Sequence, residues 1–203
     1  MTRRLGVLIS GRGSNLQSLI DAAADRRLDA TIAVVIANRA DAAGLERART
    51  AGIPIAVLEH GGYATRADYD AALVAELRRH DVGLVCLAGF MRLLGPVFVD
   101  AFPDAILNIH PSLLPAFPGV AAQAQALAHG VKVAGCTVHL VTTELDAGPI
   151  VRQAAVPVLP GDSAETLAAR ILVEEHRIYP EAVEAVLRGG WRVEGRRFVD
   201  EAR

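Results

Sequence analysis

Residues 5–15 read LGVLISGRGSN, and this stretch indicates the fold class of the chain. Its first half is an apolar run typical of a buried strand, and its second half is a turn with glycine at positions 11 and 13. Apolar residues then follow a helical period at Leu16, Leu19, Ile20 and Ala23. Strand, glycine turn and helix in this order predict the opening of an α/β fold.

The same alternation continues through the first half of the chain. Apolar runs predict strands at residues 31–37, 55–58, 82–88 and 105–109, and helical patterns occupy residues 45–51 and 66–79. The run at 82–88 is apolar throughout, as expected of a central parallel strand covered on both faces. In the 66–79 helix the inward positions are expected to be Tyr69, Leu73, Val74 and Leu77. We therefore predict a Rossmann-like, doubly wound and mostly parallel sheet.

The second half of the chain predicts an antiparallel portion. A short helix at 121–128 precedes strands at 135–141 and 149–156, which should pair antiparallel because their connection is so short. A long helix follows from a cap at Asp162 or Ser163 to about Leu187, with Leu167, Ile171 and Leu172 inward. Pro180 is expected to kink or interrupt this helix. Residues 191–199 alternate enough to form a small edge hairpin.

The composition indicates a globular protein of ordinary character. The chain has 203 residues, of which 52% are hydrophobic and 22% are charged, and this fits one domain. The net charge of -2 gives no electrostatic footprint for nucleic acid or for an anionic membrane. The apolar run at residues 5–9 is too short for a signal peptide or a membrane span. Cys86 and Cys136 lie in apolar runs without metal-ligand spacing, so we expect buried thiols and a reducing, cytoplasmic setting.

The glycine turn at residues 10–15 suits a phosphate. Its glycines allow backbone N–H groups to point outward, and the following helix N-terminus adds a partial positive charge. The turn lacks the third glycine of the dinucleotide-binding pattern, since position 16 is Leu, and it lacks the Gly-Lys-Ser/Thr of a P-loop. A plain β-to-α turn capped by Ser14 or Asn15 is an equally good interpretation.

Residues 108–115 read NIHPSLLP and carry a sharper chemical signal. Asn108 and His110 face the same side of an extended segment, at the carboxyl end of a predicted strand, where open α/β sheets place ligands. An amide beside an imidazole suits acyl transfer, because the amide stabilises an oxyanion and the imidazole moves or balances a proton. An asparagine that caps a turn and a structural histidine would leave the same pattern.

Asp146 lies between two predicted strands, in a turn that ends at Gly148. If this turn folds over the strand end that carries His110, the carboxylate would orient the ring and favour its charged form. The alternative, which spacing alone favours, is a loop carboxylate that forms an Asx turn. His139 either supports this site or packs in its strand. Neither zinc-ligand spacing nor a Gly-x-Ser-x-Gly elbow occurs, so we expect no metal site and no serine hydrolase.

Four motifs occur in order along the chain: SGRGSN at 10–15, LAGFMRLL at 87–94, NIHPSLLP at 108–115 and ELDAGP at 144–149. Together they resemble the phosphoribosylglycinamide formyltransferases, which are folate-dependent enzymes of purine biosynthesis. The resemblance runs from the first strand to about Pro180. The Asn-x-His with a later Leu-Asp-x-Gly-Pro is specific to the wider formyltransferase superfamily, and the Ser-Gly-x-Gly-Ser-Asn loop narrows it to the glycinamide branch.

The resemblance implies one formyltransferase domain over residues 1–203. A phosphate-binding half would occupy about 1–100, a folate-binding and catalytic half about 101–190, and a short tail 191–203. The implied reaction transfers the formyl group of 10-formyltetrahydrofolate, as cosubstrate and without a metal, to the amine of 5-phosphoribosylglycinamide. This is the third step of de novo purine biosynthesis.

The resemblance also assigns roles to matching positions of this chain. Asn108 and His110 should polarise the formyl oxygen, while Asp146 should charge His110 and assist proton transfer. The substrate should be held at its phosphate by Gly13, Ser14 and Asn15, and at its ribose or glycinamide part by Glu175. The folate should be bordered by Arg66, Met91, Arg92, Leu93, Leu94, Val141 and Glu144. The Leu114–Pro115 bond is expected to be cis.

One stretch departs from the family pattern, and it affects the alternatives. After Pro118-Gly119 relatives carry a polar or charged residue and an arginine, whereas residues 120–125 here read VAAQAQ, with Ala121 and Ala124 at those places. We expect altered local order or substrate affinity there. The altered stretch leaves open a non-catalytic folate-binding sensor, although the intact catalytic trio argues against it.

Two related enzymes share the trio: a formyl-folate hydrolase and methionyl-tRNA formyltransferase. The first normally has an additional N-terminal domain and the second an additional C-terminal domain, and we expect this chain to carry neither. We expect small-molecule substrates, no nucleic-acid or membrane partner, and a monomer or homodimer.

Overall fold

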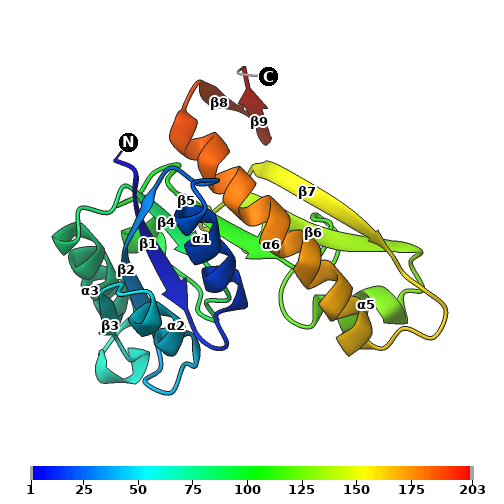
Figure 1. Cartoon of the computed structure of the whole chain (residues 1–203), viewed down its shortest axis with the longest axis horizontal. Coiled ribbons are helices and arrows are strands. Elements are labelled where there is room, and N and C mark those ends of the chain that lie inside the picture. The colour runs from blue at the N-terminus through cyan, green and yellow to red at the C-terminus, as the bar shows by residue number, and fades with distance from the viewer. Residues whose placement is uncertain (1, 202–203) are drawn as a thin grey trace. The chain divides into compact units, whose positions relative to one another are not determined.

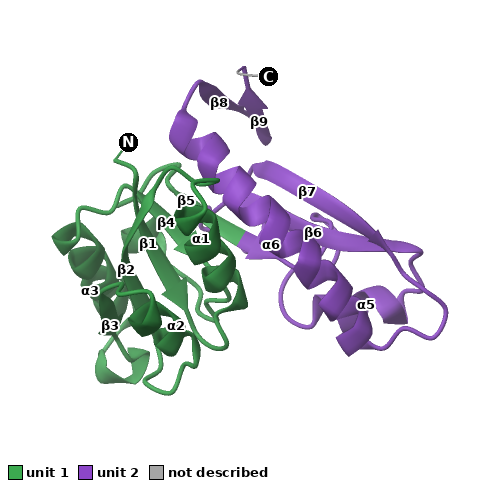
Figure 2. Cartoon of the chain, in the orientation of Figure 1, with its two compact units in different colours: residues 1–108 green, residues 109–203 purple. Residues whose placement is uncertain are grey.

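The structure is a computed structural model that describes residues 2–201 of the chain. It consists of two compact units, residues 1–108 and residues 109–203 (Figure 2). The division falls within strand β5 (Ile106–His110), so that Asn108 ends unit 1 and His110 lies in unit 2.

Unit 1 alternates strands and helices along its length (Figure 1). The strands are β1 (Arg4–Ile9), β2 (Thr31–Ala37), β3 (Ile55–Val57), β4 (Leu84–Leu87) and the first part of β5; the helices are α1 (Ser14–Ala24), α2 (Gly44–Thr50), α3 (Arg66–Arg79) and α4 (Pro96–Val99), with a short 3-10 helix at His60–Gly62. The strands are parallel in the order β3-β2-β1-β4-β5. This order reverses between β1 and β4, and open α/β sheets bind ligands at such a reversal.

The core of unit 1 is aliphatic, as the low aromatic content predicts. Strands β1, β2 and β4 are buried almost throughout, which is typical of parallel strands covered on both faces. All four inward positions predicted for α3 are buried. In α1 the prediction is half right, because Leu16 and Leu19 are buried whereas Ile20 and Ala23 are half-buried and Ala22 takes the inward place.

Unit 2 contains the antiparallel portion. Its elements are α5 (Ala122–Ala128), β6 (Val133–Leu140), β7 (Ile150–Pro157), α6 (Ala164–Arg188), β8 (Trp191–Glu194) and β9 (Arg197–Asp200). Strands β6 and β7 pair antiparallel, and α6 packs on both. β8 and β9 form the predicted hairpin, in which the rings of Trp191 and Phe198 stack with centroids 4.9 Å apart.

A bulge interrupts the β6–β7 ladder near the end at which a turn joins the two strands. Val138 pairs with Arg152 but His139 pairs with Ile150, so Val151 is an additional residue on β7. Such bulges bend a strand and redirect the neighbouring side chains. Here the bulge lies next to the turn that carries Asp146.

The predicted fold class is confirmed. Of the two outcomes predicted at Pro180, a kink or an interruption, the interruption does not occur. Helix α6 runs without a break from Ala164 to Arg188, with Ser163 as its cap. A proline inside a helix costs roughly 3 kcal/mol. Ile178, Tyr179 and Ala182 around it are at most 1% exposed, and burial of even one such large side chain contributes about 1.5–3 kcal/mol. Packing therefore outweighs the local penalty.

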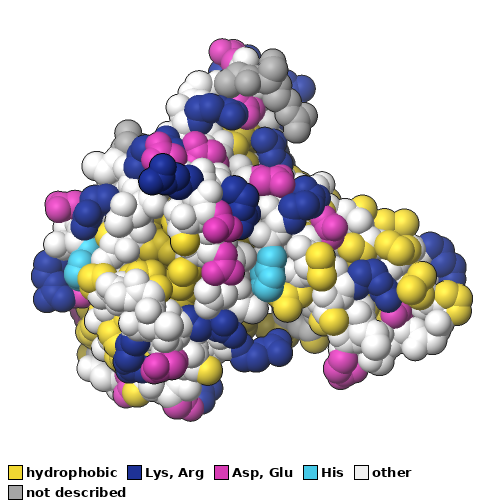
Figure 3. All heavy atoms as spheres, viewed as in Figure 1, with side chains coloured by type: hydrophobic (Ala, Val, Ile, Leu, Met, Phe, Trp, Pro, Cys, Tyr) yellow, Lys and Arg dark blue, Asp and Glu magenta, His cyan; other side chains and the backbone are white. Residues whose placement is uncertain are grey.

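Charges of both signs intermingle over the face of the molecule shown in Figure 3. This agrees with the near-neutral composition. Among residues 2–201, no helix combines the length and the apolar character that a bilayer crossing requires.

Candidate active site

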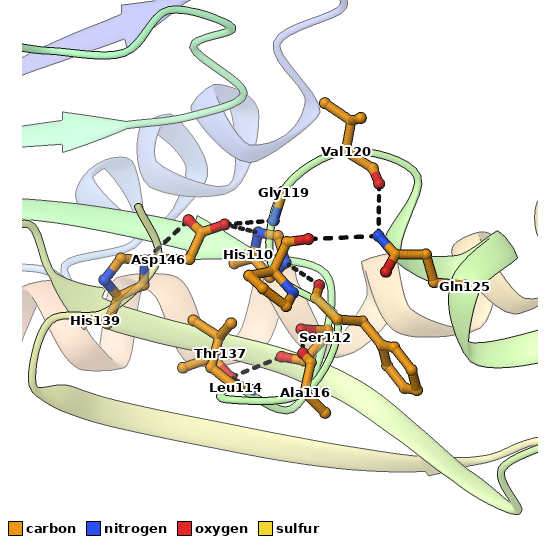
Figure 4. Close-up of polar contacts among 12 residues, drawn as sticks. His110, Ser112, Leu114, Ala116, Gly119, Val120, Gln125, Thr137, His139 and Asp146 are labelled. Atoms are coloured by element: carbon orange, nitrogen blue, oxygen red, sulfur yellow. Dashed lines mark hydrogen bonds and ion pairs between the residues drawn. The ribbon is translucent and has the colours of Figure 1, made fainter. Parts of the chain in front are cut away.

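His110 is the last residue of β5 and is 6% exposed. Its Nε2 lies 3.0 Å from the carbonyl oxygen of Phe117. A carbonyl oxygen only accepts, so this nitrogen carries the hydrogen. Its Nδ1 lies 3.4 Å from Oδ2 of Asp146 (Figure 4). The carboxylate thus lies against the ring nitrogen that the Phe117 carbonyl leaves open.

Asp146 comes from the turn between β6 and β7, and its backbone is left-handed, with φ of 51°. The side chain is only 8% exposed. Oδ2 also accepts a hydrogen bond of 2.8 Å from the backbone N–H of Gly119. A hydrogen bond from a backbone N–H to a charged carboxylate is stronger than one between two neutral groups. The turn thus folds back over the end of β5, and the Asx turn that spacing alone favoured is not what engages this carboxylate.

His139 lies on the other side of the same carboxylate, with Nε2 3.8 Å from Oδ1 of Asp146. Its Nδ1 is 2.9 Å from the carbonyl oxygen of Leu140, and that nitrogen therefore carries the hydrogen. Burial lowers the pKa of His139, while the Leu140 carbonyl and Asp146 oppose the shift. A neutral imidazole next to Asp146 supports the site, which was one of the two roles predicted for it.

The segment after His110 is bound to β6 by a network that the sequence did not reveal. Thr137 Oγ1 donates to the carbonyl of Ser112 at 2.7 Å and accepts from the N–H of Leu114 at 3.0 Å. Gln153 Nε2 donates to the carbonyl of Leu114 at 2.9 Å and to Thr137 at 3.0 Å. The Leu114–Pro115 bond is cis, as expected. The available signal was Thr137 and His139 at alternate positions of an otherwise apolar strand.

Asn108 lies two residues before His110 on β5, where it is half-buried and pairs in register with Leu87 of β4. Alternation along a strand places its side chain on the same face as His110. Because both residues lie in β5, Asn108 and His110 share one face of that strand, as their spacing predicts.

The glycine turn of unit 1 is tightly constrained. Gly13 has a left-handed backbone with φ of 69°, and a Cβ there would lie 2.7 Å from Cα of Gly44. The N–H of Gly44 donates to the carbonyl of Gly11 at 2.9 Å, and Arg47 Nε donates to the carbonyl of Arg12 at 3.0 Å. The turn between β1 and α1 is thus fastened to the start of α2, a contact that no pattern in the sequence signals.

The turn also contacts the loop after β4, across the reversal of strand order. Ser10 Oγ accepts a hydrogen bond of 2.8 Å from the N–H of Met91, and the N–H of Ser10 donates to the carbonyl of Gly89 at 3.1 Å. Met91 and Leu93 are exposed, at 68% and 57%, although both are large and apolar. Exposed apolar side chains at such a position are available to a ligand.

Asp70 of α3 anchors the far end of that loop. This carboxylate is 1% exposed, and its Oδ2 accepts a hydrogen bond of 2.7 Å from the N–H of Gly95. Burial raises the pKa of Asp70, while the Gly95 N–H and Arg66 oppose the shift. A Cβ at Gly95 would lie 2.8 Å from Asp70 Oδ2 and 3.5 Å from Cδ of Arg66. The structure thus places Arg66 next to Gly95, the residue that follows Leu94.

The predicted site residues are divided between the two units. Unit 1 holds Gly13, Ser14, Asn15, Arg66, Met91, Arg92, Leu93, Leu94 and Asn108, whereas unit 2 holds His110, Val141, Glu144, Asp146 and Glu175. Val141 and Glu144 belong to the β6–β7 turn, and Glu175 is 7% exposed on α6. Within residues 2–201 no group of three His, Cys, Asp or Glu side chains is placed to bind a metal ion.

Residues 3–183 match the model of the formyl transferase family. This protein belongs to that family. It is similar to the phosphoribosylglycinamide formyltransferase of Escherichia coli, with 46% identity over 190 residues that cover 94% of this chain and 87% of the relative. The resemblance seen in the motifs is thereby confirmed.

Two further relatives agree. The trifunctional purine biosynthetic protein adenosine-3 of Homo sapiens is 49% identical over 186 residues, which cover 92% of this chain but 18% of that relative, so this chain spans less than a fifth of it. The crystal structure of glycinamide ribonucleotide transformylase 1 from Symbiobacterium toebii superposes with a TM-score of 0.97 at 57% identity, over 98% of this chain and 94% of that one.

Proposed function

We propose that this protein transfers the formyl group of 10-formyltetrahydrofolate to the amine of 5-phosphoribosylglycinamide. The observation that carries the proposal is the buried contact of 3.4 Å between His110 Nδ1 and Asp146 Oδ2, on the strand that also presents Asn108. Relatives over nearly the whole chain support the same activity.

The reaction would begin with attack of the substrate amine on the formyl carbon. The nitrogen lone pair forms the new C–N bond, and the carbonyl electron pair moves onto oxygen. When the carbonyl re-forms, the bond from that carbon to the folate nitrogen breaks. The attacking nitrogen loses a proton and the folate nitrogen gains one, so no oxidant and no metal is required.

Asn108 and His110 would stabilise the oxyanion. Preorganised donors of this kind act most strongly in a buried site, where water cannot compete. In this structure the Nε2–H of His110 donates to the carbonyl of Phe117. The oxyanion would therefore replace the Phe117 carbonyl as the acceptor, while Asp146 remains against Nδ1 and orients the ring.

The other predicted residues would bind and orient the two substrates. The outward N–H groups of the turn at Gly13, Ser14 and Asn15 suit a phosphate at the start of the eleven-residue helix α1. The exposed Met91 and Leu93, together with Arg92 and Leu94, would border the flat pterin, and Arg66 would lie near the folate tail. Val141 and Glu144 would contact the folate, and Glu175 would contact the ribose or glycinamide part of the substrate.

The test is turnover of purified variants with both substrates. Loss of one oxyanion donor typically lowers turnover by about a hundredfold to a thousandfold. Asn108→Ala and His110→Ala should each show such a loss while folate binding, measured by fluorescence, changes little. Near-normal turnover in either variant would remove the proposal.

Incubation of wild-type protein with formyl-folate alone distinguishes transfer from hydrolysis. Transfer predicts that release of tetrahydrofolate depends on the added glycinamide ribonucleotide. Release at the same rate without it would identify a hydrolase, and saturable binding without any product would identify a sensor.

We also propose that the protein works in the cytoplasm, as a monomer or homodimer, on these small molecules. The support is the pair of buried, reduced thiols at Cys86 and Cys136 and the near-neutral charge.

A further inference from the structure

We propose that Gln125 is a positioning residue, which holds the Gly119 N–H against the Asp146 carboxylate. This inference rests on the proposed roles of Asp146 and His110. It concerns the stretch at residues 120–125, whose sequence departs from the family pattern.

The loop at residues 116–121 is held at its start, where Ser112 Oγ donates to the carbonyl of Ala116 at 2.6 Å and His110 Nε2 donates to the carbonyl of Phe117. Its second half, residues 118–121, depends on other bonds. Val120 is 81% exposed, so no apolar packing fixes the loop at that position. Ala121 precedes α5 with a left-handed φ of 56° and provides no side-chain cap. A left-handed backbone costs a non-glycine residue about 1–2 kcal/mol. The loop therefore needs specific hydrogen bonds to keep this conformation.

Gln125, the fourth residue of α5, provides two of these bonds. Its Nε2 donates to the carbonyl of Val120 at 2.9 Å and to the carbonyl of Pro118 at 3.4 Å (Figure 4). These carbonyls belong to the residues on either side of Gly119. The Pro118 carbonyl shares its peptide unit with the Gly119 N–H, whereas the Val120 carbonyl belongs to the peptide unit between residues 120 and 121. The side-chain amide thus holds the loop on both sides of Gly119 and, through Pro118, orients the Gly119 N–H.

The Gly119 N–H then determines the position of the carboxylate. It donates to Asp146 Oδ2 at 2.8 Å, and the same oxygen lies 3.4 Å from His110 Nδ1. The chain of contacts runs from Gln125 through the backbone at Gly119 to Asp146 and His110. The other titratable groups around it are His139, 3.8 Å from Asp146, and His129, whose ring is 5.1 Å from that of Phe117.

No other side chain in this stretch can take the place of Gln125. Residues 120–125 contain one valine, three alanines and two glutamines. Gln123 is on the same short helix and makes none of the bonds described above, which makes it a matched control. Alanine is the best helix former, so Gln125→Ala should not weaken α5 itself.

The test compares Gln125→Ala and Gln125→Glu with Gln123→Ala. Glutamate has the shape of glutamine but cannot donate when ionised, and its charge would face two carbonyl oxygens. We expect kcat to fall roughly ten- to hundredfold, as for small misplacements of catalytic groups, with the Glu variant lower than the Ala variant. KM for glycinamide ribonucleotide and the melting temperature should stay close to those of Gln123→Ala.

A spectroscopic measurement without substrate separates this inference from the proposed function. The amide proton of Gly119 should lose its downfield shift, and the imidazole ¹⁵N signals of His110 should change as the Asp146 carboxylate moves, in both Gln125 variants. Unchanged signals, or turnover equal to that of Gln123→Ala, would overturn the inference. Asp146→Asn tests the proposed function itself: if that variant loses turnover and the Gln125 variants do not, only the positioning role of Gln125 fails.

Discussion

At the scale of single residues, the site depends on the Asp146 carboxylate, which contacts His110, His139 and the N–H of Gly119. Asn108 and His110 could be predicted from the sequence, because a strand places alternate residues on one face. The position of Asp146 could not, since its approach depends on how a turn 36 residues beyond His110 folds back. Gln125 and the Gly119 N–H were also beyond prediction, because their roles depend on backbone geometry that side-chain identity does not encode.

Asp70 gives a prediction at the same scale, through its raised pKa. The folded protein holds the Asp70 proton more tightly than the unfolded chain does, so wild-type stability is lost as pH rises through the folded pKa. Asp70→Asn retains an acceptor for Gly95 but cannot ionise. The variant should therefore become more stable relative to wild type as the pH rises from about 4 to 7. The gain in unfolding free energy should be about 1.4 kcal/mol for each pH unit by which the folded pKa exceeds the unfolded pKa. Urea unfolding across this range measures it, and parallel pH curves would contradict it.

At the scale of elements, segments with a clear periodic or apolar pattern were predictable, and one short helix without such a pattern was missed. The bounds of β2 and α3 agree with the prediction to the residue. Helix α4 was missed because its four residues, Pro96–Val99, are too few to show a period. Pro180 misled for the opposite reason: a local rule predicts a break, whereas the burial of α6 against β6 and β7 is a tertiary effect.

The turn between β1 and α1 provides a prediction for an element. Gly13→Ala would place a Cβ on a left-handed residue and 2.7 Å from the backbone of Gly44. Neither partner can move away as a flexible side chain could, so we expect a loss of roughly 2–4 kcal/mol in unfolding free energy. Gly11→Ala is the control, because a Cβ there meets nothing within 4 Å. Equal stability of the two variants in chemical denaturation would show that the close approach is not essential.

At the scale of the whole molecule, the sequence predicted the fold class because β-α alternation and continuous apolar strands are properties of the chain itself. The core consists mainly of Ala, Val, Leu and Ile side chains in both units, with a few buried aromatic rings such as Phe98 and Tyr179. The division at residues 108 and 109 was not marked by any linker, since it falls within a strand. A composition shift could not have revealed it.

The two cysteines report on the whole molecule, because unit 1 contains Cys86 and unit 2 contains Cys136. Both are 0% exposed, and burial raises the pKa of Cys136 to about 12. Only the thiolate is an effective nucleophile. We expect neither thiol to react with iodoacetamide in the native protein, and each to react once its unit unfolds in denaturant. Peptide mapping by mass spectrometry identifies the labelled thiol, and rapid native labelling of either one would be contrary evidence.

The additional residue on β7 has a consequence for changes in chain length. Side chains alternate between the two faces of a strand, so removal of Val151 would exchange the inner and outer faces at that end of β7. Arg152 would then move toward the position that Val151 now occupies. The exposed residues 142–145 have no such constraint on their number. Homologues of different length, and engineered insertions, should therefore differ in that exposed stretch and keep the count of residues in β7 constant.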